Sequence, residues 1–162
     1  MAGKEQRGVE AAEAGLFRKR TYVLTPHAGG DSGVPETFRY WLNRIGATII
    51  EMSAQEHDAT VALTSHLPQL VSTALAATLA RAERPFVRDV FGSGLLDMTR
   101  LALSSPDLWL SIFETNKTEV TLALEAFVRQ VIGIQEALQV GELEKYFTLG
   151  RDFAYRIRET SS

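Results

Sequence analysis

The first third of the chain has the hydrophobic pattern of a strand, a helix and a second strand. The β-branched and aromatic run at 21–25 ends at Pro26, as a strand does when it leaves into a loop. Apolar residues then recur at helical spacing from Pro35, expected in the first helical turn, to a stop at Gly46. A second strand is predicted at 47–52.

This strand–helix–strand unit is too small to be complete. The helical crossover between the strands is typical of parallel pairing, and a unit with such a right-handed crossover normally lies inside a larger parallel sheet. Two strands cannot cover their own faces. We therefore expect the unit to be the tail of an α/β domain whose other strands are absent or are supplied by another chain.

The pattern is helical from Ser53 onward. Ser53 and Glu56 have the spacing of a capping box at a helix start. Pro68 predicts a kink or a restart, and the small and apolar residues after it indicate a helix that its neighbours approach closely.

A flexible break is expected at 92–94, before a helical segment at 95–104. Ser105 is predicted as an N-cap, so that the next helix starts at Pro106.

Two apolar seams follow, with alternating spacings of four and three residues on either side of a stop at Gly141. The last helix is thus expected to pack antiparallel on the previous one. Further apolar residues off these seams favour a homodimer, with a monomeric core as the alternative. The seams are Val120, Leu124, Phe127, Val131, Ile134 and Leu138, and then Leu143, Phe147, Gly150, Ala154 and Ile157.

Composition narrows the function classes. The 162 residues suggest one domain, and a net charge of -3 with a pI near 5.6 disfavours nucleic acid and membrane surfaces as partners. The absence of cysteine excludes disulfides, thiolate metal sites and cysteine nucleophiles. No export signal and no run of about 18 apolar residues occurs, so a cytoplasmic protein is expected. A complete two-domain enzyme with its own dinucleotide-binding half usually needs roughly twice this length.

His57 is the first candidate for chemistry. It lies one turn into a helix, on the side expected to carry Thr64 and Ser65. A structural role for His57, paired with a carboxylate, is an equal alternative. His66 is nine residues further on, half a turn out of phase, so the two imidazoles should not clamp a metal ion unless Pro68 distorts the backbone.

Arg100 is the second candidate, a cation among apolar neighbours. Its planar guanidinium fits a carboxylate in two parallel hydrogen bonds, which suits an acidic small molecule. The alternative is a salt bridge to Asp97 three residues earlier. Trp109 is most simply a core residue, and His27 is expected to be solvated in a loop. The sequence has no G-x-G-x-x-G, phosphate-binding loop or H-E-x-x-H motif.

Several short motifs follow one another in register between residues 57 and 116. They are His57-Asp58, Ser65-His66-Leu67-Pro68, Ala74-Leu75, Gly94, Asp97, Thr99-Arg100-Leu101-Ala102, Ser105-Pro106-Asp107-Leu108-Trp109 and Asn116. Together they resemble the C-terminal half of prephenate dehydrogenases. Residues 1–9, 16–17 and 22–26 also resemble the stretch after the family's histidine–proline pair, so the resemblance covers nearly the whole chain.

The resemblance implies an oxidoreductase of tyrosine biosynthesis. These enzymes convert prephenate to 4-hydroxyphenylpyruvate by oxidative decarboxylation with NAD or NADP. Their Rossmann domain precedes an all-helical dimerisation domain similar to the C-terminal domain of 6-phosphogluconate dehydrogenase. The expected fold is therefore mainly α, with a Rossmann remnant at 1–52 and a helical dimerisation and substrate-binding domain at 53–162.

The resemblance also implies roles for individual residues. By motif position, Arg100 would hold a substrate carboxylate, and His57, Ser65 and Gln69 would line the pocket near Trp109. The family's Gly-rich loop and catalytic histidine would lie upstream of Met1, so no catalytic residue is expected here and the chain alone is expected to be inactive. Ser93 and Gln69 stand where many members have glycine and histidine.

Two readings follow. One is the C-terminal part of a prephenate dehydrogenase, or of an arogenate dehydrogenase as a variant. The other is a stand-alone dimerising module that binds prephenate or tyrosine, for regulation or with a separate Rossmann chain. The sequence does not show whether the cofactor is NAD or NADP, or whether tyrosine inhibits the enzyme.

Overall fold

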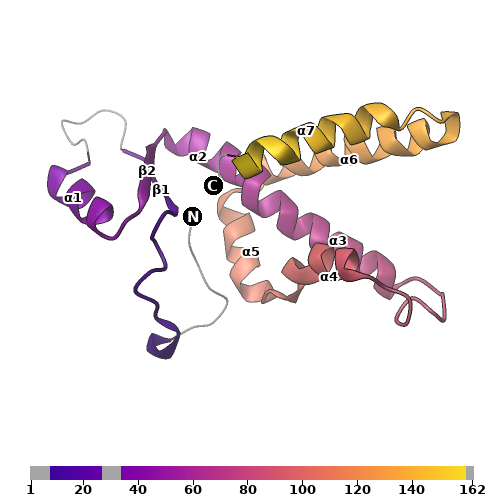
Figure 1. Ribbon diagram of the computed structural model, residues 1–162, viewed down its shortest axis with the longest axis horizontal. Helices are drawn as coiled ribbons and strands as arrows, with labels where there is room; N and C mark the ends of the chain where they lie inside the picture. Colours follow the sequence, from indigo (N-terminus) through magenta and orange to yellow (C-terminus); the bar gives the residue numbers. More distant parts are fainter. Residues whose placement is uncertain (1–7, 27–33, 160–162) are drawn as a thin grey trace. The chain divides into compact units, whose positions relative to one another are not determined.

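The computed structural model describes residues 8–26 and 34–159 and is mainly helical, as expected (Figure 1). His27 and the glycines at 29–33 lie outside the described residues, as do residues 1–7. The chain divides into two compact units, Met1–Val120 and Thr121–Ser162, which are considered separately. A short 3-10 turn, η1, spans Val9–Ala11.

The first unit begins with the predicted strand–helix–strand. Strands β1 (Thr21–Leu24) and β2 (Thr48–Glu51) pair in parallel, with Thr21 opposite Thr48, and helix α1 (Glu36–Arg44) connects them. Pro35 is the N-cap rather than the first helical residue, because its ψ of 135° is extended. Gly46 ends the helix segment at a φ of +78°, which glycine adopts readily.

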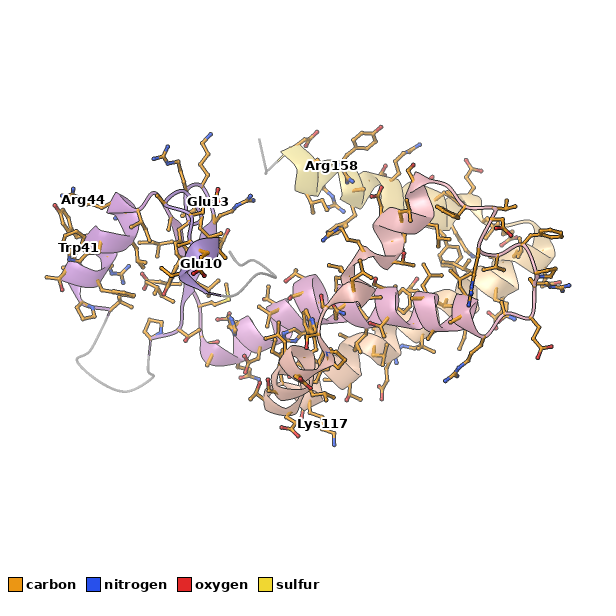
Figure 2. The ribbon with its side chains drawn as sticks, turned by 90° about the horizontal axis from the view of Figure 1, so that it is seen from below. Glu10, Glu13, Trp41, Arg44, Lys117 and Arg158 are labelled. Atoms are coloured by element: carbon orange, nitrogen blue, oxygen red, sulfur yellow. The ribbon has the colours of Figure 1, made fainter. Side chains whose placement is uncertain are left out.

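The core around this small sheet is limited. Leu24, Leu42 and Ala47 are buried. On the outer side of α1, the exposed Trp41 ring lies under the guanidinium of Arg44, 5.6 Å from it (Figure 2). Several apolar residues of the strand–helix–strand, such as Phe38, Trp41 and Ile45, are therefore not covered by the described residues.

A long helical segment follows, made of α2 (Ala54–Val61), a π turn called η2 (Ala62–His66) and α3 (Leu67–Ala80). Both hydrogen bonds of the predicted capping box are present, between Ser53 and Glu56.

Pro68 produces a π turn and not a restart. Its ring nitrogen cannot donate to the Thr64 carbonyl, and its ring displaces that carbonyl. The N–H of Leu67 instead reaches the Ala62 carbonyl five residues back, which is the π pattern. The Thr64 hydroxyl donates to the Thr60 carbonyl at 2.9 Å. The helix therefore continues through the proline.

Three shorter elements complete the first unit. They are α4 (Ser93–Thr99), the 3-10 turn η3 (Arg100–Leu103) and α5 (Pro106–Thr115). Helix α5 starts at Pro106 as predicted, although the side chain of its N-cap, Ser105, makes no capping hydrogen bond. The helix predicted at 95–104 starts at Ser93, inside the break expected at 92–94, so that part of the prediction is wrong. It tightens into a 3-10 turn at Arg100. Figure 1 shows α4 beside the C-terminal part of α3.

Helix α6 (Lys117–Val140) leads into the second unit, and α7 (Glu144–Glu159) returns in the opposite direction (Figure 1). Gly141 makes the predicted stop with a φ of +79°. The two helices approach closely where Gly133 faces the ring of Tyr146.

The predicted seam between these two helices is largely exposed, although Val120, its first residue, is buried. Leu138 is 61% exposed and Phe147 is 74% exposed, so the expectation that α7 supplies the partner for the α6 seam is wrong for these residues. None of the described helices is both long and apolar enough to span a membrane.

Candidate functional site

Polar side chains meet where α5 ends beside the π turn. The Asn116 amide Nδ2 donates to the Asp58 carbonyl at 2.8 Å and lies 3.4 Å from Nδ1 of His66. Beside them, Nδ1 of His57 lies 2.9 Å from a carboxylate oxygen of Asp58. The structure thus contains the histidine–carboxylate pair that the sequence left as the alternative for His57.

His66 is buried, and its surroundings favour its neutral form. It is 7% exposed, and its pKa is lowered from 6.5 mainly by desolvation and further by His57, against a smaller opposing effect of Asp58. The bond to the Asp58 carbonyl identifies this atom of Asn116 as the amide nitrogen. An amide nitrogen can donate hydrogen bonds but not accept them, so Asn116 is also the donor toward His66. Nδ1 of His66 is therefore the acceptor, and the ring proton belongs on Nε2.

The π turn explains why the two histidines interact. On a regular helix, nine residues would place His66 half a turn from His57. A π turn rotates the chain less per residue, which brings His66 toward the side of His57. No group of three or more metal-ligating His, Cys, Asp or Glu side chains was found in the part of the chain that the structure describes.

An aromatic cluster encloses His66. The rings of Trp109 and Phe113 both meet it edge-to-face at 6.1 Å, and they lie 5.5 Å from each other. Nε1 of Trp109 is buried, and no described residue accepts its hydrogen. Trp109 is therefore half-buried and has an unused hydrogen-bond donor, so it is not a purely apolar core residue.

Arg100 begins η3 with an exposed side chain. Among residues 8–26 and 34–159 its guanidinium has no hydrogen bond or ion pair, so the salt bridge to Asp97 is not formed. The turn itself is attached to α3, because Nε2 of Gln69 donates to the Leu101 carbonyl at 2.8 Å. Gln69 thus touches the turn that carries Arg100.

Gln69 is 4% exposed, and its Oε1 is the other buried side-chain atom for which the described residues offer no partner. Ser65 lies half-buried in the π turn. Hydrogen bonds and ring contacts therefore connect His57 to the Trp109 cluster, by way of Asp58, Asn116 and His66. A separate hydrogen bond connects Gln69 to the turn that carries Arg100.

A polar cleft of about 470 Å³ lies at the start of α6, where Figure 2 labels Lys117. Asp58, Glu114 and Glu119 line it with Lys117. Three carboxylates against one ammonium make this cleft a poor site for an acidic ligand. Arg100 is the better candidate for binding an anion.

Three residues of this region were not predicted as site residues. Asn116 and His66 act through contacts between distant segments, which periodicity does not reveal. Ser72, 2% exposed, accepts a hydrogen bond from the Ala102 N–H at 3.1 Å. Its signal was present in the sequence, as a serine within an apolar stripe three residues after Gln69.

Comparison with known proteins decides the family. The family model described as "Prephenate dehydrogenase, dimerization domain" matches residues 53–151. The chain belongs to the prephenate dehydrogenase family. The resemblance found in the sequence is thereby confirmed.

Curated relatives agree with this family assignment. The chain is 31% identical over 158 residues to a prephenate dehydrogenase of Bacillus subtilis (strain 168), covering 94% of this chain and 43% of the relative. It is 34% identical over 143 residues to a cyclohexadienyl dehydrogenase of Zymomonas mobilis, covering 85% of this chain and 48% of that relative. The chain therefore spans somewhat less than half the length of each of these two curated relatives.

Solved structures share the fold. The prephenate dehydrogenase of Aquifex aeolicus, solved with hydroxyphenyl propionate and NAD+, aligns with a TM-score of 0.87 at 30% identity, over 97% of this chain and 57% of that one. The Synechocystis arogenate dehydrogenase aligns with a TM-score of 0.81 at 27% identity, over 96% and 59%. The predicted combination of a helical domain and a small parallel sheet is confirmed.

Proposed function

We propose that this chain is the substrate-binding and dimerisation part of a prephenate dehydrogenase, which converts prephenate to 4-hydroxyphenylpyruvate by oxidative decarboxylation. The observation that carries the proposal within the chain is Arg100. It is an exposed guanidinium without an ionic partner among the described residues, on a turn held by buried hydrogen bonds. Prephenate has two carboxylates, and a guanidinium fork binds a carboxylate through two parallel hydrogen bonds.

The remaining proposed pocket residues would contact the ring of prephenate, which carries the two carboxylates. His57, Ser65 and Trp109 line the pocket in this proposal, and the buried Nε1 of Trp109 offers a hydrogen-bond donor. Holding the ring in one orientation is the main contribution that these residues can make. No catalytic residue is assigned to the chain.

The cofactor of the family, NAD or NADP, would accept hydride in the whole enzyme. The sequence lacks the G-x-G-x-x-G loop that binds a dinucleotide, so the residues present do not form its main site. We therefore assign no residue to the cofactor. The proposed division into 1–52, from a nucleotide-binding domain, and 53–162 agrees with the start of the family match at residue 53.

The proposed assembly is a cytoplasmic homodimer. Its support is the family's dimerisation domain together with the exposed apolar residues Leu138 and Phe147. Light scattering after size exclusion tests it, and Leu138→Lys with Phe147→Lys should yield a monomer. A wild-type monomer at micromolar concentration would contradict it.

The function is tested by calorimetry with prephenate. We expect Arg100→Ala to lose about 1.5–3 kcal/mol of binding free energy, the range for hydrogen bonds to charged groups. Arg81→Ala is the matched control, since Arg81 is an exposed arginine at the C-terminal end of α3. Equal binding by wild type and Arg100→Ala would refute the proposed role. Tyrosine, which also has a ring and a carboxylate, is the proposed inhibitor to titrate in the same way.

A further inference from the structure

Two side chains of α3 hold a single peptide group of η3. Nε2 of Gln69 donates to the Leu101 carbonyl at 2.8 Å, and the N–H of Ala102 donates to Oγ of Ser72 at 3.1 Å. The Leu101 carbonyl and the Ala102 N–H are the two polar ends of one peptide bond. Gln69 and Ser72 are three residues apart, so they lie on the same side of α3.

Both side chains are buried in the protein interior. Gln69 is 4% exposed and Ser72 is 2% exposed. In this low-dielectric setting a hydrogen bond is electrostatically strong, and a polar group that loses its partner is costly. The pair therefore fixes the position of the peptide group relative to α3 more firmly than exposed hydrogen bonds would.

The held peptide bond lies where the backbone changes its geometry. The α-helical pattern of α4 ends at Thr99, and η3 is a four-residue 3-10 turn. Such turns have poorer hydrogen-bond geometry than an α-helix and occur in short pieces. The Leu101 carbonyl accepts from the Ser104 N–H at 3.1 Å as well as from Gln69. Contacts from α3 thus supplement the few bonds that the turn makes itself.

Arg100 directly precedes this peptide group. Its long side chain samples many rotamers in solvent, so the position of its backbone sets the volume that the guanidinium can reach. Two-point binding of a carboxylate demands a fixed distance and plane. A small displacement of the turn would therefore weaken binding without removing any group that touches the ligand.

We propose that Gln69 and Ser72 are positioning residues that hold the Leu101–Ala102 peptide group and so place Arg100 for binding a substrate carboxylate. This inference rests on the proposed function. It gives Gln69 a different role from the substrate contact that the family resemblance implies. Both amide hydrogens of Gln69 have partners inside the protein, the Leu101 carbonyl and the Thr73 hydroxyl at 3.4 Å.

The test is prephenate titration of the 162-residue chain carrying Ser72→Ala or Gln69→Met, with Thr78→Ala as the matched control. Thr78 is on the same helix, and its exposed hydroxyl donates only to the Ala74 carbonyl of its own helix, at 2.8 Å. We expect Ser72→Ala and Gln69→Met to raise the Kd by about threefold to tenfold, the effect of one lost hydrogen bond, and Thr78→Ala to leave it unchanged.

A second readout separates positioning from general loss of structure. Amide hydrogen exchange at Ala102 should accelerate in Ser72→Ala, while exchange in the middle of α6 remains as in the wild type. In an Arg100→Lys background, Ser72→Ala should have a smaller effect on the Kd, because the two residues act through the same interaction.

The outcomes distinguish the two proposals. If Arg100→Ala weakens binding and Ser72→Ala does not, the positioning role is wrong and the proposed function stands. If Ser72→Ala weakens binding equally in the wild-type and Arg100→Lys backgrounds, Ser72 does not act through Arg100 and the inference is again wrong. If Arg100→Ala binds prephenate as the wild type does, both proposals fail.

Discussion

Asn116 and His66 are 50 positions apart in the chain, and Nδ2 of Asn116 lies 3.4 Å from Nδ1 of His66. The same Nδ2 atom donates to the Asp58 carbonyl at 2.8 Å. One buried amide therefore joins the C-terminal end of α5 to α2, through Asp58, and to the last residue of the π turn, His66. A connection of this kind fixes the geometry around His57 and Trp109 through residues outside the proposed pocket.

Replacing Asn116 by alanine should destabilise the protein by about 1–3 kcal/mol, because the buried Nδ1 of His66 and the Asp58 carbonyl each lose a donor. Urea denaturation at neutral pH measures the change. Asn43→Ala is the control, since Asn43 is exposed on α1. A loss no larger than that of Asn43→Ala would show that water replaces the Asn116 amide without cost.

His66 should make stability fall as the solution is acidified. Its pKa in the folded protein is lowered, first by desolvation, so the unfolded chain binds a proton more readily. The stability is fully present above the unfolded value of 6.5 and is lost as the pH falls below it toward the lowered pKa of the folded state.

The measurement is urea unfolding of wild type and His66→Gln above and below this range, at about pH 7.5 and pH 5. His66→Gln should be less stable at the higher pH and lose less on acidification, because it has no imidazole to protonate. Identical losses in the two proteins would exclude His66 as the source of the pH dependence.

Features with strong local signals were predicted from the sequence. The capping box of Ser53 and Glu56 and the helix start at Pro106 depend on residues a few positions apart, and both are found. The parallel pairing of the two strands followed from the helical crossover that connects them, whereas their register, with Thr21 opposite Thr48, was not predicted. In these cases the neighbouring sequence contains most of the physical cause.

Features that depend on distant contacts were not predicted. Pro68 signalled a disturbance, but the sequence did not reveal its form, a π turn, or the contact of His66 with Asn116, 50 positions away. The attachment of η3 to Gln69 and Ser72 joins residues about 30 positions apart. For Arg100, the sequence alone could not exclude the local ion pair with Asp97.

Arg100→Lys should weaken prephenate binding by about tenfold although it keeps the positive charge. Lysine presents a point charge and not a planar fork, so one of the two parallel hydrogen bonds is lost. Calorimetry measures the Kd, with Arg81→Lys as the control for a change of surface cation. If Arg100→Lys binds as tightly as the wild type, charge alone attracts the ligand and two-point recognition is wrong.

Gly133 and Gly150 should respond in opposite ways to alanine. Both lie within helices, where alanine is favoured over glycine by about 0.5–1 kcal/mol. A Cβ at Gly150 meets nothing within 4 Å, so Gly150→Ala should stabilise the protein by that amount. A Cβ at Gly133 would collide with the Tyr146 hydroxyl, and overpacking costs about 1–3 kcal/mol, so Gly133→Ala should destabilise it.

The collision can be relieved without restoring the glycine. Tyr146→Phe removes the hydroxyl and leaves the ring carbon 3.3 Å from the new Cβ, a contact that a small shift of the ring accommodates. Gly133→Ala with Tyr146→Phe should therefore be more stable than Gly133→Ala alone, as measured by thermal unfolding. If Tyr146→Phe gives no recovery, the hydroxyl is not the obstacle and the close approach of α6 to α7 at Gly133 does not set their packing.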